Sequence, residues 1–124
     1  MTQDVTTSQR QDYDGLFSGA TCPVITGTEI LTKGQNLKRG AVLGLVPSTQ
    51  KMVLVNKSAV DDSKNPYAVL AEDVDATAAD VIIPVYYSGE FNVSHLTFAA
   101  GTAAADMKHS ARLLQLFFNN VTKG

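Results

Sequence analysis

The sequence predicts a small α+β domain that is mostly β, barrel-like or sandwich-like, with one late amphipathic helix and a flexible N-terminal arm. Three observations lead to this fold class. Short runs of β-branched and aromatic residues alternate with turn-forming segments from residue 23 onward. A helical pattern of apolar residues occurs only near the C-terminus, and the residues before position 23 are mainly polar. The chain has 124 residues, enough for one domain that buries roughly two thirds of its unfolded surface.

The first 22 residues are dominated by Thr, Ser, Gln and Asp, so we expect a flexible arm (residues 1–22) followed by a single domain (residues 23–124). Such a segment has too few apolar side chains to offset the entropy that ordering costs. Residues 13–19, YDGLFSG, are more apolar than a plain linker. The arm therefore either packs on a partner, to which it can add a strand, or is an ordinary frayed terminus. We expect the fold to survive removal of residues 1–22.

After the arm the sequence becomes rich in β-branched residues, and residues 24–25 are expected to begin the first strand. Residues 41–46 and 51–55 are two further apolar runs joined by the turn-forming sequence PSTQ, which predicts a β-hairpin. Gly40 and Gly44 permit bulges or a close approach of two backbones in a small barrel or sandwich.

The central stretch contains two more predicted strands, residues 67–71 and 81–87, separated by an acidic, alanine-rich linker. In the second run, VIIPVYY, the residues alternate between two faces. One face holds Val81, Ile83, Val85 and Tyr87, and the other holds Ile82, Pro84 and Tyr86. Because proline has no N–H to donate, Pro84 predicts either an edge strand or a strand that pairs on one side only at that point.

One helix is predicted, from an N-cap at Thr102 to about residue 115. Met107, Ala111 and Leu114 are spaced so that they share one apolar face of this helix. The chain then continues into three residues that are too apolar to remain in water, so they are expected to pack into the core or into an interface. These residues are Leu116, Phe117 and Phe118.

Charge and composition exclude several classes of function. Ten basic residues oppose 12 acidic residues, and no basic cluster is larger than Lys38 with Arg39, so the basic surface of a direct nucleic-acid binder is absent. One cysteine, Cys22, cannot form an intramolecular disulfide and gives no support for an oxidised, secreted protein. No apolar run approaches the roughly 18 residues that span a bilayer, and the N-terminus lacks a signal-peptide pattern. We expect a soluble protein made in a reducing compartment, with neither nucleic acid nor membrane as a partner.

The sequence offers no convincing reactive or metal-binding set. The candidates for catalysis are Cys22, His95 and His109, with Asp106 placed on the helix where it could hydrogen-bond His109. Such pairs are common on surface helices, and a cysteine in a flexible arm is hard to hold against a histidine. The acidic linker at residues 72–80 lacks the central glycine and terminal glutamate of an EF-hand loop, so we expect a solvated turn with Asx-type caps. We predict a structural or binding protein with no catalytic residue, metal or cofactor.

The order and spacing of several segments resemble one protein family. A polar arm is followed by GAVLGLV at residues 40–46, AVLAEDVDA at residues 68–76, VIIPVYYSGEFN at residues 81–92 and a late amphipathic helix. The most specific feature is the AVLxxDVDA turn, followed by a β run that ends in a GxF step at residues 89–91. From about residue 23 to its C-terminus, the chain resembles the head decoration (capsid stabilisation) proteins of tailed bacteriophages, of the D type found in lambdoid phages.

The resemblance implies a structural protein on the outer surface of the virion capsid, synthesised in the host cytoplasm. Such proteins bind as homotrimers at the three-fold sites of the expanded head, contact the major capsid protein and stabilise the shell against the pressure of packaged DNA. The N-terminal segment in this family is flexible and orders against the capsid. Carried to this chain, the implied capsid contacts are Tyr13, Leu16, Phe17, Val24 and Ile25. The implied trimer or core residues are Leu116, Phe117 and Phe118.

Two other classes of function stay open at this stage. Small β-barrel modules that bind ligands or carbohydrates, including tail-tip or surface recognition modules, share the LxxGxxLG pattern seen at residues 37–44. A carbohydrate site would need exposed aromatic platforms, for which the candidates are Tyr67, Tyr86 and Tyr87. An enzyme would require turnover that is lost when a histidine is replaced.

Overall fold

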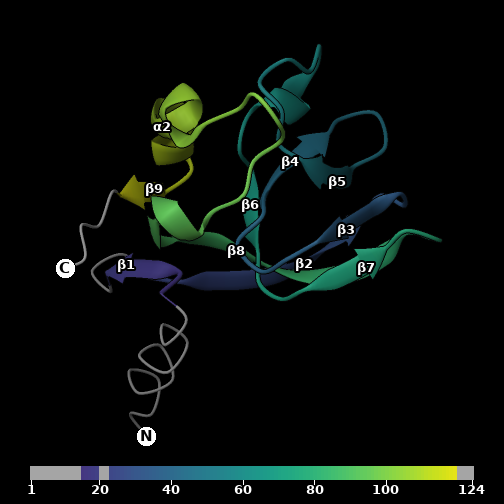
Figure 1. Ribbon diagram of the computed structural model, residues 1–124, viewed down its shortest axis with the longest axis horizontal. Helices are drawn as coiled ribbons and strands as arrows, with labels where there is room; N and C mark the ends of the chain where they lie inside the picture. Colours follow the sequence, from purple (N-terminus) through teal and green to yellow (C-terminus); the bar gives the residue numbers. More distant parts are fainter. Residues whose placement is uncertain (1–14, 20–22, 120–124) are drawn as a thin grey trace, which may run out of the picture.

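The computed structural model describes residues 15–19 and 23–119 and has a mostly β architecture with one late α-helix (Figure 1). The strands are β1 (Phe17–Gly19), β2 (Ile25–Leu31), β3 (Gln35–Leu37), β4 (Val42–Val46), β5 (Lys51–Leu54), β6 (Ala68–Leu70), β7 (Val74–Ala76), β8 (Val81–Asn92) and β9 (Leu116–Asn119). The helices are the 3-10 turns η1 (Asp62–Lys64) and η2 (Val93–His95) and the α-helix α2 (Ala104–Leu113). The predicted fold class is confirmed.

Strand β8 organises the fold. Its first half closes a ring of strands in the order β2, β5, β4, β6 and β8, because β8 pairs with both β6 and β2. The β2–β8 ladder is antiparallel and runs from Ile25 opposite Ser88 to Leu31 opposite Val81. The predicted hairpin is also confirmed, since β4 and β5 pair antiparallel from Leu43 opposite Leu54 to Val46 opposite Lys51. Only β2 and β5 are parallel neighbours in the ring.

The second half of β8 lies between two strands from opposite ends of the described chain. Strand β1 pairs with it antiparallel, with Phe17 opposite Phe91. Strand β9 pairs with it parallel, from Gly89 opposite Leu116 to Asn92 opposite Asn119. Figure 1 shows β1 and β9 together at the same side of the molecule, with α2 above them.

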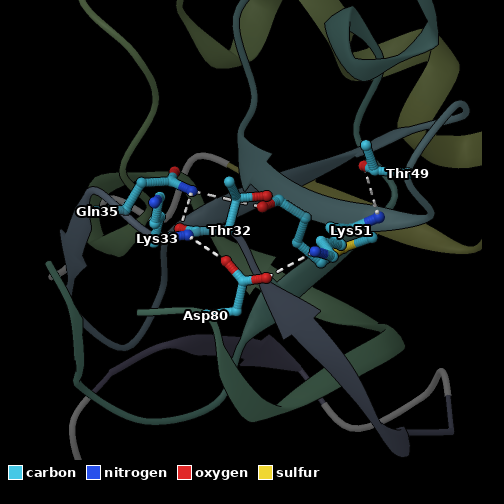
Figure 2. Close-up of polar contacts among 7 residues, drawn as sticks. Thr32, Lys33, Gln35, Thr49, Lys51 and Asp80 are labelled. Atoms are coloured by element: carbon cyan, nitrogen blue, oxygen red, sulfur yellow. Dashed lines mark hydrogen bonds and ion pairs between the residues drawn. The ribbon is translucent and has the colours of Figure 1, made fainter. Parts of the chain in front are cut away.

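The β2–β5 pairing is the shortest in the ring, and polar side chains connect the two strands there (Figure 2). The register of this pair is a single match, Leu31 opposite Met52. Asp80 accepts hydrogen bonds from the Lys33 N–H at 2.8 Å and from Lys51 Nζ at 2.6 Å. Gln35 donates through Nε2 to the carbonyl oxygen of Thr32 at 3.0 Å and accepts from the Leu54 N–H at 2.9 Å. These polar contacts join the two strands where the ladder is short.

Two hydrophobic clusters use the two faces of β8. Ile83 and Val85 are buried in the cluster inside the ring, and Val81 and Tyr87 pack against it. The predicted period-two face is therefore confirmed. The opposite face behaves differently along the strand, because Ile82 is 72% exposed whereas Tyr86 is only 4% exposed and belongs to the cluster beneath α2.

At Pro84 strand β8 has a neighbour on each side, so the edge-strand alternative is wrong. Strand β2 pairs across it, with Thr28 opposite Pro84. On the other side the β6 register ends at Leu70 opposite Val85, and the Pro84 carbonyl accepts a hydrogen bond from the Ala71 N–H at 3.0 Å. In an antiparallel strand the N–H and C=O of one residue point to the same side. An N–H at position 84 would point toward β6, and the β6 ladder has already ended there, so proline leaves no ladder hydrogen bond unmade. This agrees with the predicted pairing on one side only at Pro84.

The two predicted glycine contacts are close backbone approaches. A Cβ on Gly40, where φ is +99°, would lie 2.4 Å from the carbonyl oxygen of His95. A Cβ on Gly44 would lie 2.1 Å from the carbonyl oxygen of Ser63. No side chain fits at either distance, so both positions require glycine.

The α-helix is shorter than predicted at both ends. Its N-cap is Ala103 rather than Thr102, because the Thr102 hydroxyl oxygen accepts a hydrogen bond from the Lys57 N–H at 3.1 Å. Met107 and Ala111 are buried as predicted. Leu114 is 47% exposed, which contradicts its predicted place on the apolar face. The backbone leaves the helix at Leu114 (φ −108°, ψ 12°), so the helical spacing no longer sets the direction of this side chain.

Candidate functional site

The described part of the predicted arm, residues 15–19, is packed into the domain. Leu16 is 1% exposed and Phe17 is 7% exposed, and both belong to the cluster beneath α2. The Leu16 carbonyl accepts a hydrogen bond from the Asn92 N–H at 2.7 Å. In this arrangement neither side chain can contact a partner without leaving the core.

The other predicted arm contacts are placed differently. Val24 packs against the same cluster, whereas Ile25 at the start of β2 is 54% exposed. Tyr13 and Cys22 lie outside the described residues. The assigned capsid contacts are thus not brought together on one surface by the part of the chain that the structure describes, and their role stays a prediction.

Removal of residues 1–22 would take two buried side chains out of the core. The division at residue 23 stays a prediction, and the burial of Leu16 and Phe17 leads us to expect that this truncation destabilises the domain. The sequence did not indicate the burial of Leu16 and Phe17, because they are isolated apolar residues in a polar segment. A strand of 3 residues is also too short to show a period of two.

An aromatic cluster fixes β1 on β8. The ring of Phe17 packs edge-on against Tyr86, with a centroid separation of 5.1 Å and an interplanar angle of 73°. It also lies 5.2 Å from the ring of Phe91. A Cβ on Gly89 would lie 3.3 Å from Cε1 of Phe17 and 3.1 Å from Cζ of Phe91, so the glycine of the GxF step makes room for both rings.

Arg39 covers this cluster. Its guanidinium carbon is 5.9 Å from the ring centroid of Phe17 and 5.5 Å from that of Tyr86. Nη1 donates to the Tyr86 hydroxyl oxygen at 2.6 Å and to the Ala71 carbonyl oxygen at 3.0 Å. A buried phenol needs a hydrogen-bond partner, and Arg39 supplies it. Nothing in the sequence links position 39 with positions 17 and 86.

The chain enters β1 through a tight contact with η2. Gly15 has φ of +79°, and a Cβ there would lie 2.9 Å from Nε2 of His95. The Asn119 Nδ2 of β9 donates to the Ser18 hydroxyl oxygen of β1 at 2.9 Å. These contacts place residues 15–19 firmly on the domain.

The three apolar residues after α2 form most of β9. Leu116 is fully buried, Phe118 is 1% exposed and packs edge-on against Phe98, and Phe117 is half-buried. Leu116 and Phe118 belong to the same cluster as Leu16 and Phe17. Their side chains are therefore placed in the core of this chain.

The described residues that were considered for catalysis or metal binding are not brought together in a reactive site. His95 packs against Gly15, whereas His109 is on the exposed part of α2. Asp106 accepts a hydrogen bond from the Ala103 N–H at 2.8 Å, and this bond, with Lys57 at 3.5 Å, keeps the pKa of Asp106 below its ordinary value. Among the described residues no group of three or more His, Cys, Asp or Glu side chains could hold a metal ion.

Two acids of the 72–80 linker, Asp73 and Asp75, accept backbone hydrogen bonds. Asp75 accepts hydrogen bonds from the backbone N–H and the hydroxyl of Thr77, and these bonds lower the pKa of Asp75. Asp73 accepts from the Arg39 N–H at 2.9 Å. The predicted solvated turn is therefore only partly right, because residues 74–76 form strand β7, which pairs with β3 and buries Ala76. The Asx-type cap at Asp75 is as predicted.

The three tyrosines that the structure describes do not provide the open platform that a carbohydrate site needs. Tyr86 is buried, and Tyr67 and Tyr87 are half-buried and pack edge-on against each other with centroids 6.1 Å apart. A groove of about 280 Å³ lies beside Tyr67. It is lined by Leu45, Pro47, Asp62, Asn65, Pro66, Tyr67 and Leu114.

In residues 15–19 and 23–119 no helix is long and apolar enough to cross a membrane.

Comparison with known proteins gives the family directly. The family model for bacteriophage lambda head decoration protein D matches residues 5–117. No match was found among curated protein sequences. The matched region includes β1 to β8, α2 and the start of β9, and thus the whole ring and the aromatic cluster. The protein therefore belongs to the family of bacteriophage lambda head decoration protein D, whose members are structural proteins that decorate the phage capsid and are not enzymes.

Proposed function

We propose that this protein binds as a homotrimer at the three-fold sites of the expanded phage head. There it holds neighbouring copies of the major capsid protein together against the internal pressure of packaged DNA. The observation that carries the proposal is the family match over residues 5–117. The fold is compatible with it, because a compact β domain with two buried clusters can serve as a rigid cement without any reactive site.

We further propose that the arm contacts the capsid through residues that precede β1. Leu16 and Phe17 are buried in this chain, so in the proposal they anchor the arm to the domain and residues 1–14, with Tyr13 among them, supply the contact. Three weak arm contacts in one trimer give a high overall affinity, because after the first arm binds each later contact is effectively intramolecular.

The test is co-sedimentation of purified protein with expanded, undecorated heads of its source phage. The full chain is compared with a chain that begins at Gly15, which keeps β1 and its buried side chains. We expect saturable binding of the full chain in multiples of three for each three-fold site, and loss of binding for the shortened chain. Full occupancy by the shortened chain would contradict the proposed contact between the arm and the capsid. Failure of both chains to bind would contradict the proposed capsid role.

A further inference from the structure

Arg39 connects three parts of the fold that are far apart in the sequence. Its side chain lies over Phe17 of β1, donates to the hydroxyl of Tyr86 in β8 and donates to the carbonyl of Ala71 just after β6. Its backbone N–H donates to Asp73 at 2.9 Å. The guanidinium fork can serve several acceptors at once in a fixed geometry, which lysine cannot do.

Strand β1 depends on side-chain packing more than on its ladder. It has 3 residues, and its register with β8 shifts between Phe17 and Gly19. Short, irregular ladders of this kind open locally at low free-energy cost. The burial of Leu16 and Phe17 and the cover that Arg39 provides therefore decide how often β1 leaves β8.

We propose that Arg39 is a positioning residue for attachment to the phage head. By holding Phe17 against Tyr86 it keeps β1 docked, and docked β1 fixes the point from which the N-terminal arm leaves the domain. This inference rests on the proposed function, because Arg39 can affect binding to the head only if the arm contacts the head. When β1 undocks, the arm is attached to the domain only from β2 onward. The length of chain between the arm and the domain then increases, which lowers the effective concentration of the arm at its site.

The first experiment measures docking by amide hydrogen exchange in Arg39→Met. The reporter is the Asn92 N–H, which is donated to the Leu16 carbonyl, and the reference is the Val55 N–H, which is donated to the Val42 carbonyl within the ring. The matched control is Lys38→Met, which removes the same charge from a neighbouring side chain that is 74% exposed.

We expect exchange of the Asn92 amide to accelerate about ten- to a hundredfold in Arg39→Met, the range for losing hydrogen bonds from a charged donor. The Val55 amide should change much less, and Lys38→Met should leave both unchanged. Arg39→Lys should give an intermediate rate at Asn92. If Asn92 and Val55 accelerate by the same factor, or neither changes, Arg39 does not control β1 docking and the inference is overturned.

A milder variant keeps the test available if Arg39→Met does not fold. Tyr86→Phe removes only the hydroxyl that accepts from Arg39 at 2.6 Å and keeps the ring. It should accelerate exchange at Asn92 selectively, by a smaller factor. Equal acceleration at Val55 would again overturn the inference.

The second experiment compares binding of the wild type, Arg39→Met and Lys38→Met to expanded, undecorated heads. We expect Arg39→Met to bind about three- to tenfold more weakly, because each arm is less well placed, and Lys38→Met to bind as the wild type does. If the wild type does not bind, the proposed function fails, and the exchange result alone still shows whether Arg39 holds β1. If Arg39→Met frees the Asn92 amide yet binds heads as tightly as the wild type, the positioning role is overturned.

Discussion

The ring of Tyr87 lies directly over Gly27, where a Cβ would be 2.3 Å from Cε2 of the tyrosine. Gly27 faces Val85 across the β2–β8 ladder, so Tyr87 reaches diagonally onto the neighbouring strand. Its hydroxyl donates to the carboxylate of Glu29. Burial first, and then Glu29, raise the pKa of Tyr87 above its ordinary value, so the hydroxyl remains a donor throughout the neutral range.

Gly27→Ala should therefore destabilise the protein by displacing this ring. We expect a loss of about 1–3 kcal/mol in the free energy of unfolding, measured by urea denaturation. In a Tyr87→Ala background the same change should be neutral, or stabilising by about 0.5–1 kcal/mol, because alanine is more favourable than glycine in an open strand. An equal loss in both backgrounds would show that the ring is not the cause.

Gly44→Ala should be more damaging than Gly27→Ala. The added Cβ would meet the carbonyl oxygen of Ser63 at 2.1 Å, and a backbone atom in a capped turn cannot rotate away as a ring can. We expect a loss of about 3 kcal/mol, at the upper end for overpacking, seen as a lower thermal midpoint. A loss smaller than that of Gly27→Ala would mean that η1 shifts easily.

Two truncated chains should differ sharply in stability. A chain that begins at Gly15 keeps Leu16 and Phe17, so its unfolding free energy should match that of the full chain. A chain that begins at Pro23 lacks both buried side chains and should lose several kcal/mol, since deletion of one such side chain costs about 2–5 kcal/mol. The control is Phe17→Ala in the full chain, which should fall between them. Equal stability of the two truncated chains would contradict the packing of β1.

The Asp80 carboxyl should titrate below its ordinary pKa of 3.8 because it accepts hydrogen bonds from Lys51 first and then from the Lys33 N–H. A pKa that is lower in the folded state stabilises the fold above the unfolded pKa, and this contribution is lost as the pH falls through the folded pKa. Lys51→Met should therefore raise the pKa of Asp80 toward 3.8 and reduce the acid dependence of stability in this pH window. Carboxyl NMR titration measures the shift, with Lys64→Met as the charge-matched control. Identical titration of Asp80 in wild type and Lys51→Met would refute the assignment.

The alternation of residues in β8 could be predicted because the strand is long enough, at 12 residues, to show a period of two. The β4–β5 hairpin could be predicted because two apolar runs are joined by the turn-forming sequence PSTQ. The helix and the burial of Met107 and Ala111 were predictable from the spacing of the apolar residues, although the backbone is kinked at Met107 (φ −134°, ψ 15°). The end of the helix was not predictable, because the backbone leaves the helix at Leu114 and Gln115 has a φ of +66°. Local backbone geometry there overrides the pattern of apolar residues.

The candidate site was less predictable than the fold. Leu16 and Phe17 were recognised as important, but their burial depends on pairing with a strand about 75 residues later, which local composition cannot show. Arg39 has no sequence signal at all, because its partners become neighbours only when the ring closes. The spacing of the GxF step at Gly89 was informative, since the glycine makes room for both Phe17 and Phe91.

The position of β8 between β1 and β9 has a mechanical consequence. A pull on one end of the described chain against the other passes from β1 into the second half of β8 and on to β9. The strands of the ring other than β8 lie off this line of tension. Because β1 is antiparallel and β9 parallel to β8, the start of β1 and the end of β9 both lie beside Asn92. Such a pull would therefore peel the two outer strands from β8 one hydrogen bond at a time, rather than shear them, and would leave the barrel unstressed.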